Sequence, residues 1–145
     1  MFGPPTTSTY ALPANATTAA GSVGPAKITV RAGLDTPVPV QTPTCEQVEL
    51  SFTRTGCSPT RIILDTQALR VHFVYGAGRG YRSAPWTPGE DLTIFADRGS
   101  FEIFIGDGTH TLSSLDFSGE GDRTLTVTAV NGPADVTITG EELAD

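Results

Sequence analysis

The sequence predicts an all-β protein, a two-sheet antiparallel β-sandwich of jelly-roll-like type with an extended N-terminal arm. Short runs in which apolar and polar residues alternate recur along the chain, about nine in number, with turn residues between them every 8–12 residues or so. The 16 glycines and 11 prolines supply many turns, and the abundant threonines favour strands. No run has the length and period of a three-turn helix.

The most regular strands lie in the segment 92–117, which predicts a three-stranded meander. Its alternating runs are, in order, Leu92–Ala96, Ser100–Ile105 and Thr109–Phe117. Asp-Arg-Gly and Gly-Asp-Gly turns join them, and such turns favour hairpins because Gly and Asp accept a positive φ. Glu102 and Phe104 share the face opposite Phe101 and Ile103, and this mixed face predicts partial cover by another layer.

Six further runs complete the predicted strands; in chain order they span residues 27–32, 46–54, 61–64, 69–75, 124–130 and 135–139. The run 46–54 alternates Val48, Leu50 and Phe52 with polar residues, so these three are expected to face the core. In the run 69–75 the inward positions are expected to be Leu69, Val71, Phe73 and Tyr75. The proline-rich segment 36–44 predicts an extended connection, because proline cannot donate to a β-ladder.

Length and charge limit the classes of function. A chain of 145 residues supports one domain. Its net charge of −7, with Lys27 as the single lysine, argues against binding nucleic acid or an anionic membrane, since both need a positive surface. No run is long and apolar enough for a membrane-spanning helix.

Residues 1–25 are predicted to form the arm, and residues 26–145 the sandwich domain. The segment is rich in Pro, Thr, Ala, Gly and Ser, so it has too little apolar surface to offset its ordering entropy alone. Its isolated apolar residues Phe2, Tyr10 and Leu12 are therefore expected to contact a partner, either the same domain or a neighbouring subunit. If Met1 is the native start, export through a signal peptide is not expected, because a basic start and an apolar core are missing.

Cys45 and Cys57 flank the strand predicted at 46–54. They either form a disulfide, worth about 3 kcal/mol by loop-closure entropy, or remain two thiols in a reducing compartment. Neither a metal site nor another cofactor is predicted, because two cysteines without a nearby histidine fall short of four ligands.

The glycine-rich segment 76–89 is predicted to be a long loop, and it contains the densest group of ligand-binding side-chain types: Arg79, Tyr81, Arg82 and Trp86. Exposed aromatic rings stack on sugar rings while neighbouring polar groups bond the hydroxyls, so this loop is a candidate glycan-binding site. The alternative is that Trp86 and Tyr81 cap one end of the sandwich and the glycines only form the turn.

No catalytic residue is predicted. His72 and His110 have no serine, cysteine or second histidine placed to form a triad. Four carboxylates of the meander could in principle pair at the separation of about 5–10 Å that glycoside hydrolysis needs, but turn caps and solvated charges explain them better. These are Asp97, Glu102, Asp107 and Asp116.

The run from Asp97 to Phe104 (DRGSFEIF), followed by Asp107-Gly108 and TLSS at 111–114, resembles the C-terminal β-sandwich domain of family 32 glycoside hydrolases, which include invertases, levanases and inulinases. Gly99 departs from the serine usual in that family, and the resemblance is confined to the meander. In those enzymes the nucleophile and the acid lie in a separate propeller domain, within NDPNG, RDP and EC motifs that do not occur here. The resemblance therefore implies a sandwich without the catalytic propeller.

Two hypotheses of function follow. The first is a non-catalytic structural protein that decorates or cements the outside of a viral (phage) capsid or another virion part, anchored by its arm to capsid subunits or to copies of itself. The alternative is a carbohydrate-binding or stabilising accessory module related to fructan hydrolases, extracellular as part of a secreted glycosidase. Neither hypothesis assigns the chain an enzymatic activity.

Overall fold

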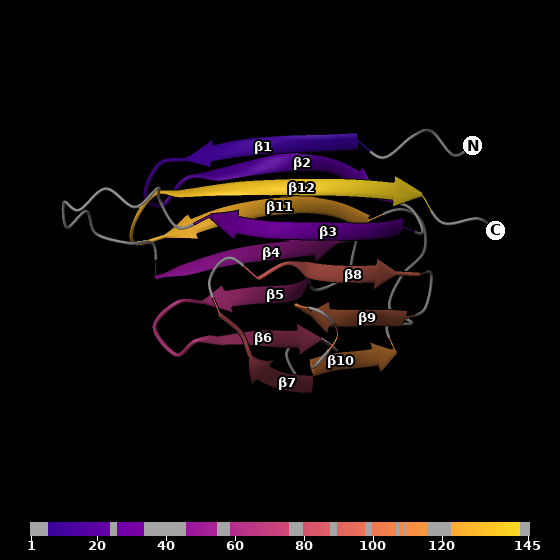
Figure 1. Ribbon diagram of the computed structural model, residues 1–145. Coiled ribbons are helices and arrows are strands. Elements are labelled where there is room, and N and C mark those ends of the chain that lie inside the picture. Colours follow the sequence, from indigo (N-terminus) through magenta and orange to yellow (C-terminus); the bar gives the residue numbers. More distant parts are fainter. Residues whose placement is uncertain are drawn as a thin grey trace.

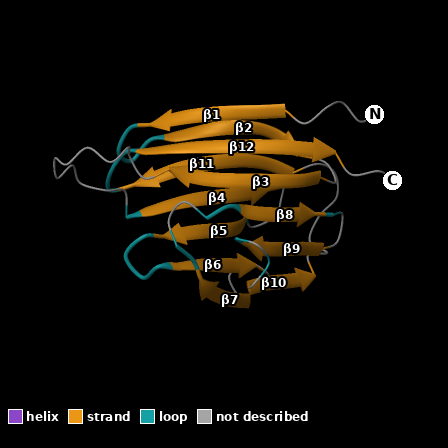
Figure 2. Cartoon of the chain, viewed as in Figure 1, coloured by secondary structure: helices purple, strands orange, loops and turns teal. Residues whose placement is uncertain are grey.

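The computed structural model describes residues 6–23, 26–33, 46–54, 59–75, 80–87, 90–97, 100–106, 108, 110–115 and 123–142. Within these ranges the chain forms strands and connecting loops and no helix, as Figure 2 shows, so no helix there could span a membrane. The strands form two six-stranded antiparallel sheets that pack face to face. The predicted two-sheet sandwich is therefore confirmed.

The first sheet has the strand order β1-β12-β3-β8-β9-β10 (Figure 1). Its strands are β1 (Thr6–Leu12), β12 (Ala134–Glu142), β3 (Ala26–Gly33), β8 (Leu92–Ala96), β9 (Ser100–Ile105) and β10 (His110–Leu115). The predicted meander is thus confirmed as β8, β9 and β10. Gly106 and Gly108 have φ values of 63° and 93°, the left-handed backbone that their turn needs.

The second sheet has the strand order β2-β11-β4-β5-β6-β7. Its strands are β2 (Thr17–Val23), β11 (Arg123–Val130), β4 (Gln47–Thr53), β5 (Thr60–Asp65), β6 (Arg70–Tyr75) and β7 (Gly80–Pro85). The consecutive strands β1 and β2, β3 and β4, and β11 and β12 occupy matching places in opposite sheets, whereas β4 to β7 and β8 to β10 are neighbours within one sheet. The two sheets share one core between their inner faces.

An aromatic cluster joins the two sheets within this core. Phe101 of β9 packs edge-on against Phe52 of β4 and Phe73 of β6, with ring centroids 5.3 Å and 5.9 Å apart. All three rings are buried. The guanidinium of Arg123, also buried, lies 4.4 Å from the Phe101 ring centroid and donates to the Asp97 carbonyl at 2.7 Å. This cation–π contact closes the end of the core where β11 begins.

The N-terminal segment differs from the predicted arm. Residues 6–12 pair with β12 and residues 17–23 pair with β11, so the segment supplies an edge strand to each sheet of its own domain. Leu12 is buried in the core and Tyr10 packs against it, whereas Phe2 lies outside the described residues. Backbone pairing explains this outcome, because β11 and β12 would otherwise present unpaired N–H and C=O groups along their open edges.

Two predictions about β6 and its neighbours are wrong. Residues 80–85 of the predicted loop form β7, which pairs with β6 along its whole length. Leu69 does not face the core; it lies in the turn before β6 with φ 56° and is 52% exposed. Val71 and Phe73 are buried as predicted, and Tyr75 is partly buried against the core.

The outer face of the first sheet explains the mixed pattern of β9. Phe104 packs edge-on against Phe95 of β8, with ring centroids 5.6 Å apart, and both rings are half-buried. The exposed Glu102 lies opposite Phe95 in the β8–β9 register. The described residues place no third layer over this face, so the two rings shield each other instead.

Trp86 follows β7 directly and anchors this strand to the core. Its side chain is buried, its backbone N–H donates to the Leu69 carbonyl at 3.0 Å, and its indole Nε1 donates to the Glu90 carbonyl at 3.2 Å. The ring thus contributes apolar burial while its one polar group is bonded.

We expect Trp86→Ala to lower the free energy of unfolding by about 3–5 kcal/mol, because it leaves a cavity in the core. Thr87→Ala, next in the chain and exposed, is the control and should change stability by less than about 0.5 kcal/mol. Urea unfolding followed by far-ultraviolet circular dichroism measures both changes. A cost below about 1 kcal/mol for Trp86→Ala would contradict the burial of the indole.

Candidate functional site

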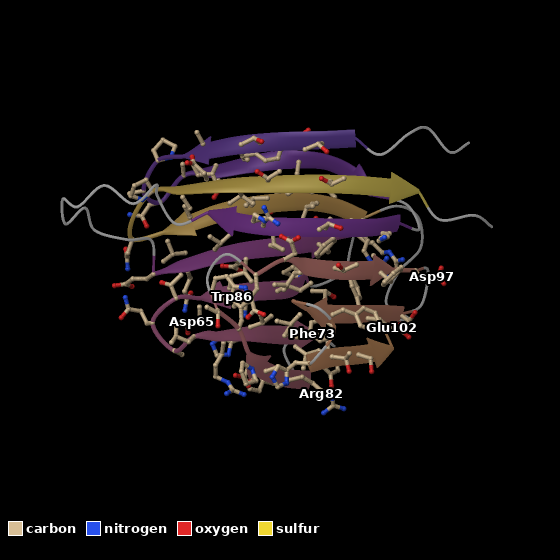
Figure 3. The ribbon with its side chains drawn as sticks, in the orientation of Figure 1. Asp65, Phe73, Arg82, Trp86, Asp97 and Glu102 are labelled. Atoms are coloured by element: carbon tan, nitrogen blue, oxygen red, sulfur yellow. The ribbon has the colours of Figure 1, made fainter. Side chains whose placement is uncertain are left out.

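The four residues of the predicted glycan site do not come together. Tyr81 lies opposite Val74 on the outer face of β7, whereas Arg82 lies opposite Phe73 on the side of the core. The Arg82 guanidinium lies 6.0 Å from the Tyr75 ring centroid, at the open edge of the sandwich (Figure 3). Trp86 is buried and offers no ring face to a ligand. Arg79 lies outside the described residues.

Tyr81 instead belongs to a hydrogen-bonded row across three strands, which we name the outer-face triad: Asp65 of β5, His72 of β6 and Tyr81 of β7. His72 Nε2 lies 2.9 Å from Asp65 Oδ2, and His72 Nδ1 lies 2.5 Å from the Tyr81 hydroxyl oxygen. The sheet register brings these residues together, because β6 pairs with β5 on one side and with β7 on the other.

Asp65 of β5 holds the end of the outer-face triad that lies farthest from the edge strand β7. Its Oδ1 accepts the backbone N–H groups of Gln67 and Ala68, both at 2.9 Å, and so caps the turn between β5 and β6. Burial alone would raise the pKa of Asp65. The hydrogen bonds from Ala68, His72 and Gln67 together outweigh it and hold this pKa below its usual value. Asp65 is therefore an anion at neutral pH.

The charge of Asp65 determines which atoms donate and which accept in the hydrogen bonds of His72. An ionised carboxylate only accepts, so His72 Nε2 carries a proton and donates it to Asp65. In the neutral imidazole Nδ1 is then an acceptor, and it accepts a hydrogen bond from the Tyr81 hydroxyl group. The lone pairs of the Tyr81 oxygen remain available to a ligand from solvent.

Further polar side chains surround the outer-face triad. Arg70 Nε donates to the Ser83 hydroxyl at 3.1 Å, joining β6 to β7. On the neighbouring strands Arg61 donates to Glu49 at 3.2 Å. Tyr81 as a residue is 56% exposed, and its ring stacks beside the His72 ring with centroids 5.8 Å apart and an interplanar angle of 26°. The face therefore offers an aromatic ring held in place by polar neighbours.

Those remaining candidate residues that the structure describes form no second site. Asp97 and Glu102 are exposed near the β8–β9 turn, at the opposite end of the strands from Asp65 (Figure 3). His110 is exposed at the start of β10. Asp107, Asp116, Cys45 and Cys57 lie outside the described residues. In the part of the chain that the structure describes, no three acidic, histidine or cysteine side chains are placed to hold a metal ion.

The sequence comparison with protein families decides the relationship of this chain. Residues 1–142 match the family described as "Glycosyl hydrolases family 32 C terminal". The chain belongs to this family. The match extends far beyond the meander that carries the sequence resemblance, and it includes β1 and β2. A search of curated proteins found no match.

Solved structures of family 32 enzymes share the fold. The chain superposes on an exo-inulinase from Aspergillus awamori with a TM-score of 0.71 at 17% identity, covering 97% of this chain and 29% of the enzyme. It matches a GH32 β-fructofuranosidase from Bombyx mori with a TM-score of 0.60 at 22% identity, covering 92% of this chain and 25% of the enzyme. For a fructofuranosidase from Schwanniomyces occidentalis the TM-score is 0.68 at 13% identity, and the match covers 100% of this chain and 34% of the enzyme.

The family 32 sandwich therefore spans about a quarter to a third of the enzymes it matches. The 145 residues correspond to the non-catalytic C-terminal domain, and the catalytic propeller of the family is not among them. The comparisons support the accessory-module alternative of the two hypotheses. They provide no support for capsid decoration.

Sequence reasoning missed Asp65 and treated His72 as an ordinary polar-face residue. Alternation does place His72 on an outer position, but it cannot reveal that His72 lies between Asp65 of β5 and Tyr81 of β7. The available signal was the four-residue turn Thr66–Leu69, which returns β6 beside β5 and brings His72 back to Asp65.

We expect Asp65→Ala to lower the free energy of unfolding at pH 7 by about 1–3 kcal/mol, because two backbone N–H groups and His72 lose their acceptor. A carboxylate with a lowered pKa stabilises the fold above its unfolded pKa of about 3.9, and this contribution is lost as the pH falls through the folded pKa. The difference between wild type and variant should therefore narrow below about pH 4.

Urea unfolding at pH 7 and at pH 2.5–3 measures this difference, with the exposed Asp135→Ala as a matched control that should cost little at either pH. An unchanged cost for Asp65→Ala at both pH values would show that the charge of Asp65 does not stabilise the turn.

Proposed function

We propose that this protein is a non-catalytic accessory domain that acts beside a family 32 catalytic domain and stabilises it. The match of residues 1–142 to the family 32 C-terminal domain is the observation that carries the proposal. The coverage of the relatives supports it, because this chain matches nearly whole to about a third or less of each enzyme.

The physical basis is a sandwich that completes its own core. Both sheets bury their inner faces against each other, and the core contains the aromatic side chains Phe52, Phe73, Trp86 and Phe101. Such a domain folds without borrowing apolar surface from another one. It can then present a rigid surface to a neighbouring domain, in the same polypeptide or in a partner chain. Contact with the folded state alone of that neighbour stabilises it.

Capsid decoration required residues 1–25 to reach across to a neighbouring subunit. Residues 6–23 instead pair with β11 and β12 of the same chain. The predictions of a virion partner and a virion location stay untested, and the substrate class of the catalytic domain, a fructan or sucrose, belongs to the proposal.

The proposal is tested by precipitating the protein from its native source with an antibody and assaying hydrolysis of sucrose, inulin and levan. We expect hydrolysis in the precipitate and none by the purified 145-residue chain, because the catalytic groups belong to another domain. Precipitation with non-immune antibody is the control. A precipitate without hydrolytic activity, or activity in the purified chain itself, would contradict the proposal.

A further inference from the structure

We propose that the outer face of β6 and β7 around Tyr81 is a binding subsite for a neutral sugar ring. The inference rests on the proposed function, since it names the class of ligand that the accessory domain would hold. The subsite consists of the Tyr81 ring, the Tyr81 and Ser83 hydroxyl groups, and the side chains of His72 and Arg70 that hold them.

Among the described residues, Tyr81 is the aromatic residue whose side chain is exposed. It and Leu69 are the two exposed large apolar side chains among the described residues. Unlike Leu69, which lies in a turn, Tyr81 lies on a strand and its hydroxyl is bonded to His72. A ring already held in place loses little freedom when a ligand stacks on it, so this position suits a sugar face.

The hydrogen bonds within the face give the subsite its polarity. With neutral His72 donating to Asp65, Tyr81 donates a hydrogen bond to His72 Nδ1 and its oxygen presents acceptor lone pairs to solvent. The Ser83 oxygen accepts from Arg70, so the Ser83 hydroxyl proton is available to a ligand. Both residues lie on the same face of β7, two positions apart. An acceptor next to a donor complements two hydroxyl groups of one sugar, since each hydroxyl can both donate and accept.

Charge favours a neutral ligand. On this face Asp65 pairs with His72, and Glu49 pairs with Arg61. The guanidinium of Arg70 is a cation within the subsite and is bonded to Ser83. The acceptor oxygen of Tyr81 and, at longer range, the net charge of −7 repel an anion. Sulfated or uronic-acid polymers are therefore poor candidates, whereas fructans and other uncharged glycans fit.

The test is electrophoresis of the folded protein through native gels containing inulin or levan, with heparin as the charged comparison. We expect the neutral polymers to retard the wild-type protein and heparin to leave its migration unchanged. Tyr81→Ala should weaken retardation about tenfold, because stacking and the acceptor oxygen are both lost. Tyr81→Phe keeps the ring and should weaken it about threefold.

Arg82→Ala is the matched control, because Arg82 is the next residue of β7 and lies on the opposite side of the strand. It should leave retardation unchanged, as should Tyr10→Phe at the far edge of the first sheet. Circular dichroism shows that each variant is folded. Retardation that persists in Tyr81→Ala, or that is lost in Arg82→Ala instead, would overturn the subsite, as would retardation by heparin alone.

The two experiments distinguish an error in the proposed subsite from an error in the proposed accessory role. If the antibody precipitate hydrolyses fructans but retardation does not depend on Tyr81, the subsite is wrong and the accessory role stands. If retardation depends on Tyr81 but the precipitate is inactive, the domain binds glycans without a family 32 partner, and the accessory role is wrong.

Discussion

The shared core between the two sheets is the constraint on which the rest of this molecule depends. Each inner strand gives every second side chain to that core, so only the alternate positions face solvent. On β4, Val48, Leu50 and Phe52 are buried, while the residues between them face outward. The two six-stranded sheets pack face to face, so each sheet covers the apolar face of the other.

The same alternation separates the residues that looked like one site. Tyr81 and Arg82 are adjacent in sequence, but the strand directs them to opposite faces of β7. The outer positions of β5, β6 and β7 bring polar side chains together without disturbing the core. Asp65 completes the outer-face triad because it lies at the end of β5, where its carboxylate also caps the turn. The turn cap and the proposed sugar subsite thus share one hydrogen-bond network.

The sequence predicts the strands with regular apolar alternation and misses three edge strands that lack it. β4, β8 and β9 have apolar alternation and, around the meander, turn residues, so pattern reasoning finds them. β1, β2 and β7 lie at sheet edges, where threonines and backbone pairing suffice; Thr7 bonds Thr139 and Thr17 bonds Thr128 across the ladders. The outer-face triad depends on the register of three strands, which alternation alone does not specify.

The central claim is that the N-terminal segment is part of this sandwich rather than an arm for a neighbour. Hydrogen exchange of the backbone amides, followed by nuclear magnetic resonance, tests it most directly. The structure predicts that those amides of β1 and β2 that bond to β12 and β11 exchange far more slowly than free peptide amides. If residues 6–23 exchanged at the rate of an unstructured peptide while β4 and β5 stayed protected, the segment would not be part of the sandwich. That result would support the N-terminal arm instead.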